Sequence, residues 1–164
     1  MAQLLSRCSL IPLVLSLALA QQKTDLAATT SPQVLFVCEH GAAKSVIAAS
    51  YFNKLAAERG LPERAIARGV QPDPVYSSAV VRGLQQDGVS VKEGKPTKVT
   101  EADIAKAARV VTLGCKLPTA SRSAEKAVDW ADLPSPSENY SAARQAIRER
   151  VEQLVDELSK QKKR

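Results

Sequence analysis

One short segment of this sequence places a thiol, a cation and a hydroxyl close together: Cys38, Glu39, His40, Gly41, Ala42, Ala43, Lys44 and Ser45. We call residues 38–45 the thiol loop. It follows an apolar run at 34–37 and precedes a helical pattern, so it lies where a strand passes into a helix. The N-terminus of a helix presents unpaired N–H groups and a partial positive charge, which together bind anions.

A cysteine at such a junction is stabilised as the thiolate. A thiolate that faces a bound tetrahedral oxyanion is a nucleophile directed at phosphorus or arsenic. In this interpretation the backbone of residues 39–44 holds the oxyanion and the Lys44 ammonium adds a full positive charge. The Ser45 hydroxyl donates a hydrogen bond to the Cys38 sulfur.

Two other interpretations of the thiol loop compete with this one. Ala43-Lys44-Ser45 matches the end of a nucleotide-binding P-loop, but Cys38 and Ala43 stand where that motif needs glycine. The second alternative is a buried structural cysteine. A thiol, a glycine, a cation and a hydroxyl at one strand-to-helix junction favour the reactive site. His40, the one histidine, belongs to no Cys/His cluster of zinc spacing, so we expect neither a metal nor a cofactor.

Strand and helix patterns alternate along the rest of the chain. Apolar runs predict strands at 34–37, 65–67, 109–113 and 127–128. Caps and apolar stripes predict helices at 44–59 and 73–86, a short helix from 100, and a long last helix that starts at the Ser135–Glu138 capping box. This order predicts an α/β fold in three layers, a parallel sheet with helices on both faces. Ligands of such sheets bind beyond the carboxyl ends of the strands, where the thiol loop lies.

The N-terminal residues have the pattern of a secretory signal peptide. Arg7 precedes a short apolar stretch that ends in Ala18-Leu19-Ala20. We therefore expect a leader at 1–20, a linker at 21–32, a globular domain at 33–160 and a basic tail at 161–164, in a secreted or periplasmic protein. A buried N-terminal helix is the alternative, and Pro12 disfavours it.

Composition narrows the classes of function. The chain has 164 residues, a formal charge of +6 and 45% apolar residues, which excludes collagen, low-complexity disorder and a disulfide-dense miniprotein. The basic excess is compatible with attracting anions but is not concentrated enough to indicate nucleic acid. No apolar run reaches the roughly 18 residues of a membrane span, so we expect membrane contact only through an uncleaved leader.

From Val34 to Ser45, and in the order of elements that follows, the sequence resembles the low-molecular-weight protein tyrosine phosphatases. Thioredoxin-coupled arsenate reductases share their fold. The family motif is C-x5-R-S after the first strand, and the resemblance covers roughly residues 33–158. It implies a four-stranded parallel sheet in the order 2-1-3-4, with Cys38 as the nucleophile. Lys44 replaces the motif's arginine, and Gly41 stands where the family has an asparagine in the left-handed conformation.

The resemblance also implies an aspartate, after the fourth strand, that protonates the leaving group. We call residues 129–134 the acid loop. Asp132 is favoured over Asp129 as the general acid, although Leu133 rather than proline follows it. Phosphotyrosine enzymes of the family sandwich the substrate ring between aromatic side chains, for which Trp130 and Tyr76 are the available candidates here.

Cys115 closely follows the third predicted strand, which neighbours the first in the family order. Adjacent strands lie about 4.8 Å apart, so Cys38 and Cys115 should be close. Arsenate reductases of this fold use a nucleophile and two further cysteines. Cys115 resembles the first of these, but residues 116–164 contain no cysteine.

Three functions therefore stay open. The leading hypothesis is a phosphomonoester hydrolase that forms a phosphocysteine on Cys38 and acts on a phosphorylated small molecule or protein. The second is an arsenate reductase that uses Cys38, Cys115 and a thiol reductant. The third is a non-catalytic oxyanion-binding module, suggested by the lysine in place of arginine.

Overall fold

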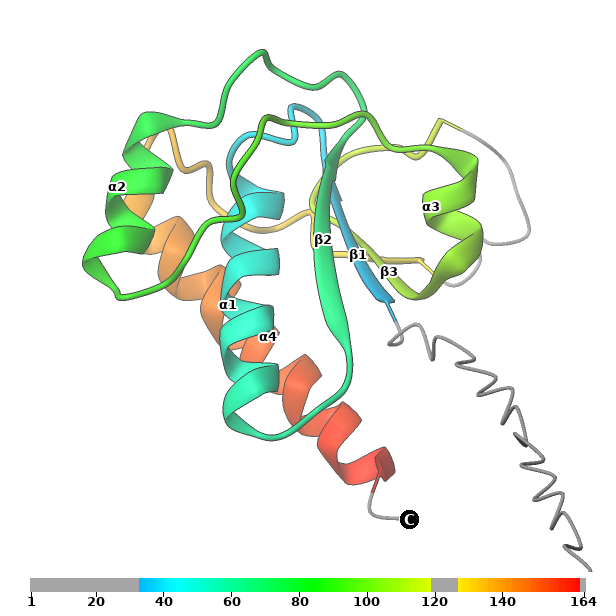
Figure 1. Ribbon diagram of the computed structural model, residues 1–164. Coiled ribbons are helices and arrows are strands. Elements are labelled where there is room, and N and C mark those ends of the chain that lie inside the picture. The colour runs from blue at the N-terminus through cyan, green and yellow to red at the C-terminus, as the bar shows by residue number, and fades with distance from the viewer. Residues whose placement is uncertain (1–32, 119–126, 163–164) are drawn as a thin grey trace, which may run out of the picture.

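The computed structural model describes residues 33–118 and 127–162, which form one α/β unit (Figure 1). The leader and linker expected at 1–32 and the last two residues of the expected tail lie outside the described residues. The elements in chain order are β1 Gln33–Cys38, α1 Lys44–Glu58, β2 Arg64–Gly69, α2 Ser78–Gln86, α3 Glu101–Lys106, β3 Ala107–Thr112, β4 Ala127–Asp129 and α4 Tyr140–Lys162.

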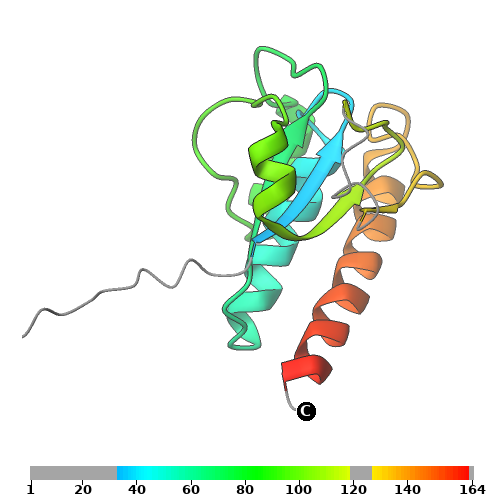
Figure 2. The ribbon, with the colours of Figure 1, turned by 90° about the vertical axis from the view of Figure 1, so that its right-hand side faces the viewer.

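The four strands form one parallel sheet in the order β2-β1-β3-β4. Helices α1 and α4 cover one face, with α2 beside them, and α3 covers the other, so the molecule has three layers (Figure 2). The predicted fold class and strand order are both confirmed. Strand β1 lies in the middle of the sheet, between β2 and β3, so its carboxyl end opens at the centre of one edge.

Strand β1 is buried on both faces, as expected of a central parallel strand. Leu35 and Val37 pack with α3 and its neighbours, whereas Val34, Phe36 and Cys38 belong to the larger core under α1 and α4. The alternation of side chains along the strand therefore places the Cys38 thiol on the α1 side, at the end of the strand.

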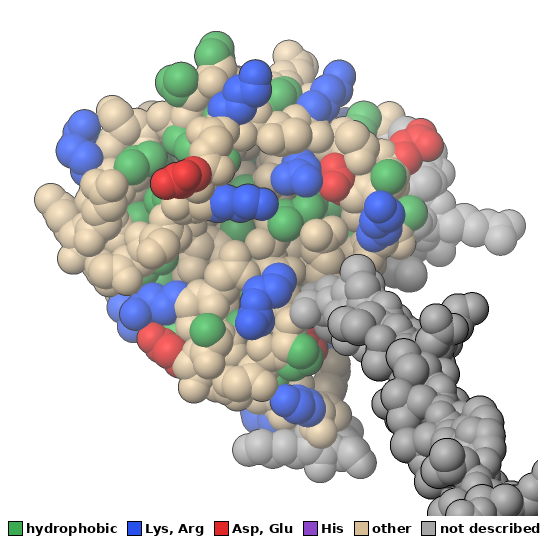
Figure 3. Space-filling view, viewed as in Figure 1, with side chains coloured by type: hydrophobic (Ala, Val, Ile, Leu, Met, Phe, Trp, Pro, Cys, Tyr) green, Lys and Arg blue, Asp and Glu red, His purple; other side chains and the backbone are tan. Residues whose placement is uncertain are grey.

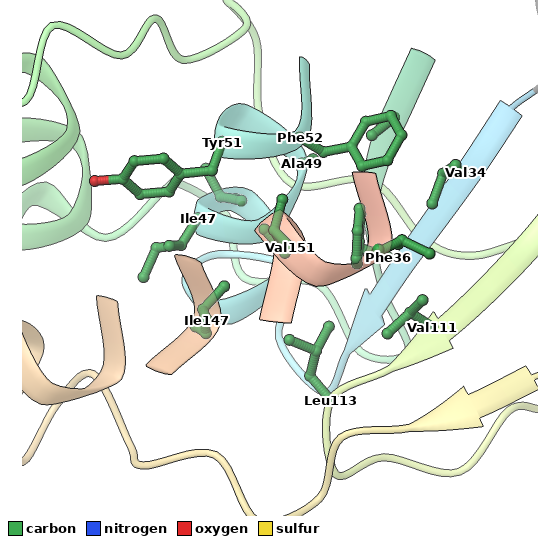
Figure 4. Close-up of a cluster of buried hydrophobic side chains, with 14 of the residues drawn as sticks. Val34, Phe36, Ile47, Ala49, Tyr51, Phe52, Val111, Leu113, Ile147 and Val151 are labelled. Carbon is green, nitrogen blue, oxygen red and sulfur yellow. The ribbon is translucent and has the colours of Figure 1, made fainter. Parts of the chain in front are cut away.

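Aromatic and branched side chains fill the larger core (Figure 4). The Phe36 ring lies 6.1 Å from the Phe52 ring and 5.8 Å from the Trp130 ring, measured between centroids. Ile147 and Val151 of α4 belong to the same core, and they are fully buried, as are Phe36 and Phe52. Each such side chain stabilises the fold by about 1.5–3 kcal/mol when it leaves water.

The predicted start of α2 is wrong, and the reason involves the thiol loop. Asp73 followed by Pro74 predicts a helix start, but α2 begins at Ser78. The backbone N–H of Asp73 donates to the carbonyl of His40, and that of Ser77 donates to the carbonyl of Ala42. These long-range bonds hold residues 73–77 against the thiol loop, where a helical turn would not reach the same acceptors.

The predicted start of the last helix is also displaced. The Ser135–Glu138 capping box predicts a start near 135, but α4 begins at Tyr140. The Ser135 carbonyl instead accepts hydrogen bonds from the N–H groups of Glu138 and Asn139, which forms a turn. The side chain of Asn139 then accepts from the Ala142 N–H at 3.0 Å and caps the helix. Asn139 thus lies just before the helix and satisfies one of the backbone N–H groups of its first turn, which have no partner within the helix.

Basic side chains are spread over the face shown in Figure 3, with fewer acidic ones between them, and they form no single block there. This agrees with the modest basic excess of the sequence. Within residues 33–118 and 127–162, no helix has the length and apolar character that crossing a membrane requires.

Asn139→Ala should lower the free energy of unfolding by about 0.5–2 kcal/mol, because the Ala142 N–H loses its side-chain acceptor. Ser135→Ala is the matched control. The Ser135 hydroxyl contacts the Ser137 hydroxyl at 2.7 Å on the surface, so its loss should change stability by less than about 0.5 kcal/mol. Urea unfolding followed by circular dichroism measures both. A larger loss for Ser135→Ala than for Asn139→Ala would contradict the assigned start of α4.

Candidate active site

Cys38 is the last residue of β1, and its sulfur lies 3.2 Å from the Ser45 hydroxyl oxygen in the first turn of α1. Cys38 is 6% exposed, and Ser45 is fully buried. Cys38 forms no disulfide. The Ser45 hydroxyl can therefore donate a hydrogen bond to the sulfur in a site with little water. This contact agrees with the pairing predicted from the sequence.

Four carbonyls of the thiol loop point outward and accept hydrogen bonds from one neighbouring segment, residues 70–77. The pairs, with the carbonyl first, are Cys38 with Val70 at 3.1 Å, Glu39 with Gln71 at 2.8 Å, His40 with Asp73 at 3.0 Å and Ala42 with Ser77 at 3.1 Å. Because N–H and C=O of one peptide unit point in opposite directions, these bonds turn the loop's N–H groups inward.

These inward N–H groups are free to bind a ligand. Within the described ranges, the backbone N–H groups of residues 39–44 donate to no protein acceptor. Helix α1 starts at Lys44 without a side-chain cap, and its first turn carries no acidic residue. We call these N–H groups, together with the Cys38 sulfur, the cup. Its donors and the helix dipole suit an anion.

Two glycines allow the thiol loop to lie against β2. Gly41 has a φ of +61°, a conformation that glycine adopts without strain. A Cβ on Gly41 would lie 2.8 Å from the backbone nitrogen of Gly69, and a Cβ on Gly69 would lie 2.7 Å from the nitrogen of Gly41. The prediction that Gly41 takes the left-handed position is confirmed. Gly69, the last residue of β2, was not singled out by the sequence.

Lys44 connects the cup to the acid loop. Its ammonium donates to the backbone carbonyl of Leu133 at 3.2 Å, and the Leu133 side chain is buried. An ammonium has three N–H donors, so two remain for an oxyanion in the cup. The role of Lys44 in holding an oxyanion stays a prediction, and the contact with Leu133 is one that the sequence did not indicate.

The other side chains of the thiol loop differ in how far they are exposed to solvent. Glu39 is half-buried, Ala42 is buried and Ala43 is half-buried. The His40 side chain is 64% exposed and its Nδ1 lies 3.2 Å from a carboxylate oxygen of Asp73. In the part of the chain that the structure describes, no three His, Cys, Asp or Glu side chains gather into a metal-binding group.

Cys115 lies beside the end of β1, as the sequence predicts. Its thiol donates to the Val37 carbonyl at 3.4 Å. Burial, opposed by a backbone hydrogen bond at Leu113 and assisted by negative charge on Cys38, Glu39 and Asp129, raises the pKa of the Cys115 thiol to about 11. At neutral pH Cys115 is therefore a protonated thiol.

Neither aspartate of the acid loop bonds to the thiol loop. Asp129 accepts hydrogen bonds from the Thr112 hydroxyl at 2.8 Å and from the Gly114 N–H at 3.0 Å, which fixes it at the end of β3. The Asp132 side chain is 70% exposed and pairs with Arg150 on α4. Asp132 is therefore largely exposed, and its partner lies on the helix.

The two aromatic candidates differ in their surroundings. Trp130 is 7% exposed and packs on Phe36, so it belongs to the core. The Tyr76 hydroxyl donates to the Lys95 carbonyl at 3.2 Å. Among the residues described, the sequence missed the 70–77 segment, Gly69 and Arg150, because their roles depend on contacts between distant parts of the chain.

A family model described as low molecular weight phosphotyrosine protein phosphatase matches residues 33–164. A solved structure of arsenate reductase from Archaeoglobus fulgidus is 30% identical, with a TM-score of 0.64, over 75% of this chain and 98% of that chain. A comparison with curated proteins gave no match.

Two further structures are less similar in sequence. The thioredoxin-dependent arsenate reductase of Corynebacterium glutamicum has a TM-score of 0.68 and 24% identity over 80% of this chain, which spans 63% of that chain. A low molecular weight protein tyrosine phosphatase from T. tengcongensis has a TM-score of 0.68 and 20% identity, over 77% of this chain and 99% of that chain. At these identities the likeness shows the fold alone.

Gly69→Ala should weaken binding of inorganic phosphate, because the new Cβ meets the Gly41 backbone at 2.7 Å and displaces the thiol loop. Overpacking of this kind costs about 1–3 kcal/mol, which corresponds to about five- to hundredfold in affinity. Gly88→Ala is the control, since Gly88 has a φ of +64° but open space around it. It should lower stability and leave phosphate affinity unchanged. Titration calorimetry measures the phosphate affinity of both variants. An equal loss of affinity in Gly69→Ala and Gly88→Ala would contradict the account.

Alkylation of Cys115 should be slow at neutral pH and should accelerate about tenfold for each pH unit up to about pH 10, because the reactive thiolate forms only as the pH nears the pKa of about 11. Iodoacetamide labelling with peptide mapping separates Cys115 from Cys38 and Cys8. A Cys115 rate that levels off below pH 9 would contradict the buried, protonated thiol.

Proposed function

Because the chain belongs to the low molecular weight phosphotyrosine protein phosphatase family, we propose that it is a phosphomonoester hydrolase acting through a phosphocysteine on Cys38. The family consists of cysteine-based enzymes, and the structures that resemble this chain include phosphatases and arsenate reductases. The observation that carries the proposal is the cup itself. A thiol sulfur lies 3.2 Å from a buried hydroxyl, at the start of a loop whose N–H groups have no protein acceptor among the described residues.

In the first step of the proposed reaction, the phosphoryl oxygens occupy the N–H groups of the cup. The Cys38 thiolate attacks phosphorus, so an S–P bond forms while the P–O bond of the ester breaks. The leaving oxygen takes a proton from a carboxylic acid, for which Asp132 is our candidate. The Ser45 hydroxyl holds the sulfur in position throughout.

In the second step, water attacks the phosphocysteine. The Asp132 carboxylate accepts a proton from that water, the S–P bond breaks, and inorganic phosphate leaves. Cys38 returns to the thiolate and Asp132 returns to the acid. The cycle consumes water alone and needs no cofactor.

Lys44 supplies the positive charge that the family's arginine supplies elsewhere. A guanidinium grips two phosphoryl oxygens with a planar fork, whereas an ammonium acts as a point charge. The Lys44 ammonium also donates to the Leu133 carbonyl, which leaves fewer donors for the substrate. We therefore expect phosphate affinity to be kept and the transition state to be held less tightly than by arginine.

The proposed substrate is a phosphorylated small molecule or protein rather than phosphotyrosine in particular. Trp130 packs on Phe36 in the core and is not available to stack on a substrate ring. Leu133, which follows Asp132, is buried as well. The export expected from residues 1–20 remains a proposal that rests on the sequence pattern.

Arsenate reduction is the second candidate, favoured by the position of Cys115 beside the end of β1. Cys38 would attack arsenic with loss of water, and Cys115 would then attack the Cys38 sulfur. This forms a disulfide and releases arsenite, two electrons passing from the thiols to arsenic, and an external thiol would reduce the disulfide. The raised pKa of Cys115 leaves little thiolate for that attack at neutral pH, which places this function second.

Reduced protein should hydrolyse p-nitrophenyl phosphate, and Cys38→Ser should lower kcat by at least about a thousandfold, because the nucleophile is removed. Cys115→Ser separates the two candidates. Under the leading proposal it keeps phosphatase turnover, and under the second it abolishes arsenate reduction. Absence of Cys38-dependent turnover under reducing conditions would contradict the hydrolase. If phosphate still binds and Lys44→Arg gains turnover, the chain is an oxyanion-binding module.

A further inference from the structure

Arg150 occupies a fixed position on α4. Its guanidinium carbon lies 5.9 Å from the centroid of the Trp130 ring, a cation–π arrangement. The ring is itself held against Phe36, at 5.8 Å between centroids. Arg150 is one-third exposed, so the core below it and the ring beside it restrict its side chain.

The Asp132 carboxylate is held on this arginine. The two side chains form an ion pair, and both line a groove between α4 and the edge of the sheet at β3 and β4. No residue of the thiol loop lines that groove. The carboxylate of the favoured general acid is therefore bonded to α4 and forms no hydrogen bond or ion pair with the thiol loop.

The backbone next to Asp132 nevertheless contacts the side chain of Lys44, the residue at the end of the thiol loop where α1 begins. The carbonyl of Leu133 accepts the Lys44 hydrogen bond at 3.2 Å. Successive Cα atoms lie about 3.8 Å apart, so Asp132 is one residue from a cup contact. Rotation of its side chain, without a large movement of the acid loop, is the change that would turn the carboxylate toward a bound substrate.

We propose that Arg150 is a positioning residue that draws Asp132 onto α4 and so makes the enzyme selective for phosphoesters with good leaving groups. This rests on the proposed hydrolase function. A leaving group that is already a stable anion departs without a proton, whereas a poor one requires Asp132. Substrates of the second kind react only when Asp132 has left Arg150.

The expected effect of Arg150 on selectivity is limited by the solvent exposure of its ion pair with Asp132. Exposed ion pairs stabilise their geometry by up to about 1 kcal/mol, which corresponds to about fivefold in the fraction of free Asp132. The groove is also lined by Glu149, the neighbour of Arg150 on α4, and by Arg109 on β3. Arg148 pairs with Glu152 on the same helix and does not contact the acid loop.

The test compares kcat/KM for p-nitrophenyl phosphate and phenyl phosphate, using the reduced full chain. The ratio of these two constants reports the need for a proton on the leaving oxygen. Arg150→Gln should raise kcat/KM for phenyl phosphate about two- to fivefold and leave p-nitrophenyl phosphate nearly unchanged. Arg150→Lys should restore the original ratio, and Arg148→Gln, the matched control, should not move it.

Asp132→Asn completes the test. It should lower phenyl phosphate turnover more than p-nitrophenyl phosphate turnover, and Arg150→Gln should have no effect when combined with it. The inference is overturned if Arg150→Gln changes both substrates by the same factor, or if its effect persists with Asp132→Asn. Either result leaves Cys38-dependent hydrolysis standing. Absence of hydrolysis in the unaltered chain overturns the proposed function, and the role of Arg150 falls with it.

Discussion

The site depends on the hydrogen bonds that turn the carbonyls of the thiol loop away from its centre. Four carbonyls between Cys38 and Ala42 are bonded to N–H groups of residues 70–77. Those bonds fix the peptide planes, so the opposite N–H groups converge on the space above the Cys38 sulfur. The cup is thereby preorganised before any ligand arrives, which is how fixed dipoles stabilise charge without reorganisation. The backbone contact between Gly41 and Gly69 keeps the two segments close enough for these bonds.

Few charged side chains of the described residues contact the thiol loop. Lys44 adds one cation, and the same ammonium joins the first turn of α1 to the acid loop through Leu133. Cys115 stays protonated beside the site because it is buried. The acid loop thus contacts Lys44 through the backbone carbonyl of Leu133. Its carboxylates bond to other elements, Asp129 to β3 and Asp132 to α4. Under the proposed function, the loop would bind the oxyanion and Asp132 would have to leave Arg150 before it could deliver a proton.

Much of the fold could be predicted from local patterns. The apolar run of β1, the capping box at Thr100 and the apolar stripe of α4 each reflect a single element, and the structure contains all three. The starts of α2 and α4 could not be predicted in this way. Bonds between Asp73 and His40, about thirty residues apart in sequence, override the helix signal of Asp-Pro. In the same way, Cys38, Ser45 and Gly41 follow from one loop, whereas Arg150 contacts Asp132 only because α4 packs beside the sheet.

The central claim is that the cup binds a tetrahedral oxyanion directly above the Cys38 sulfur. A crystal structure of the reduced protein with tungstate tests it most directly, because anomalous scattering locates the metal atom without ambiguity. The account predicts tungsten above the sulfur, with its oxygens accepting hydrogen bonds from the N–H groups of the thiol loop and from Lys44. Tungstate bound elsewhere, with those N–H groups turned to protein acceptors, would contradict it.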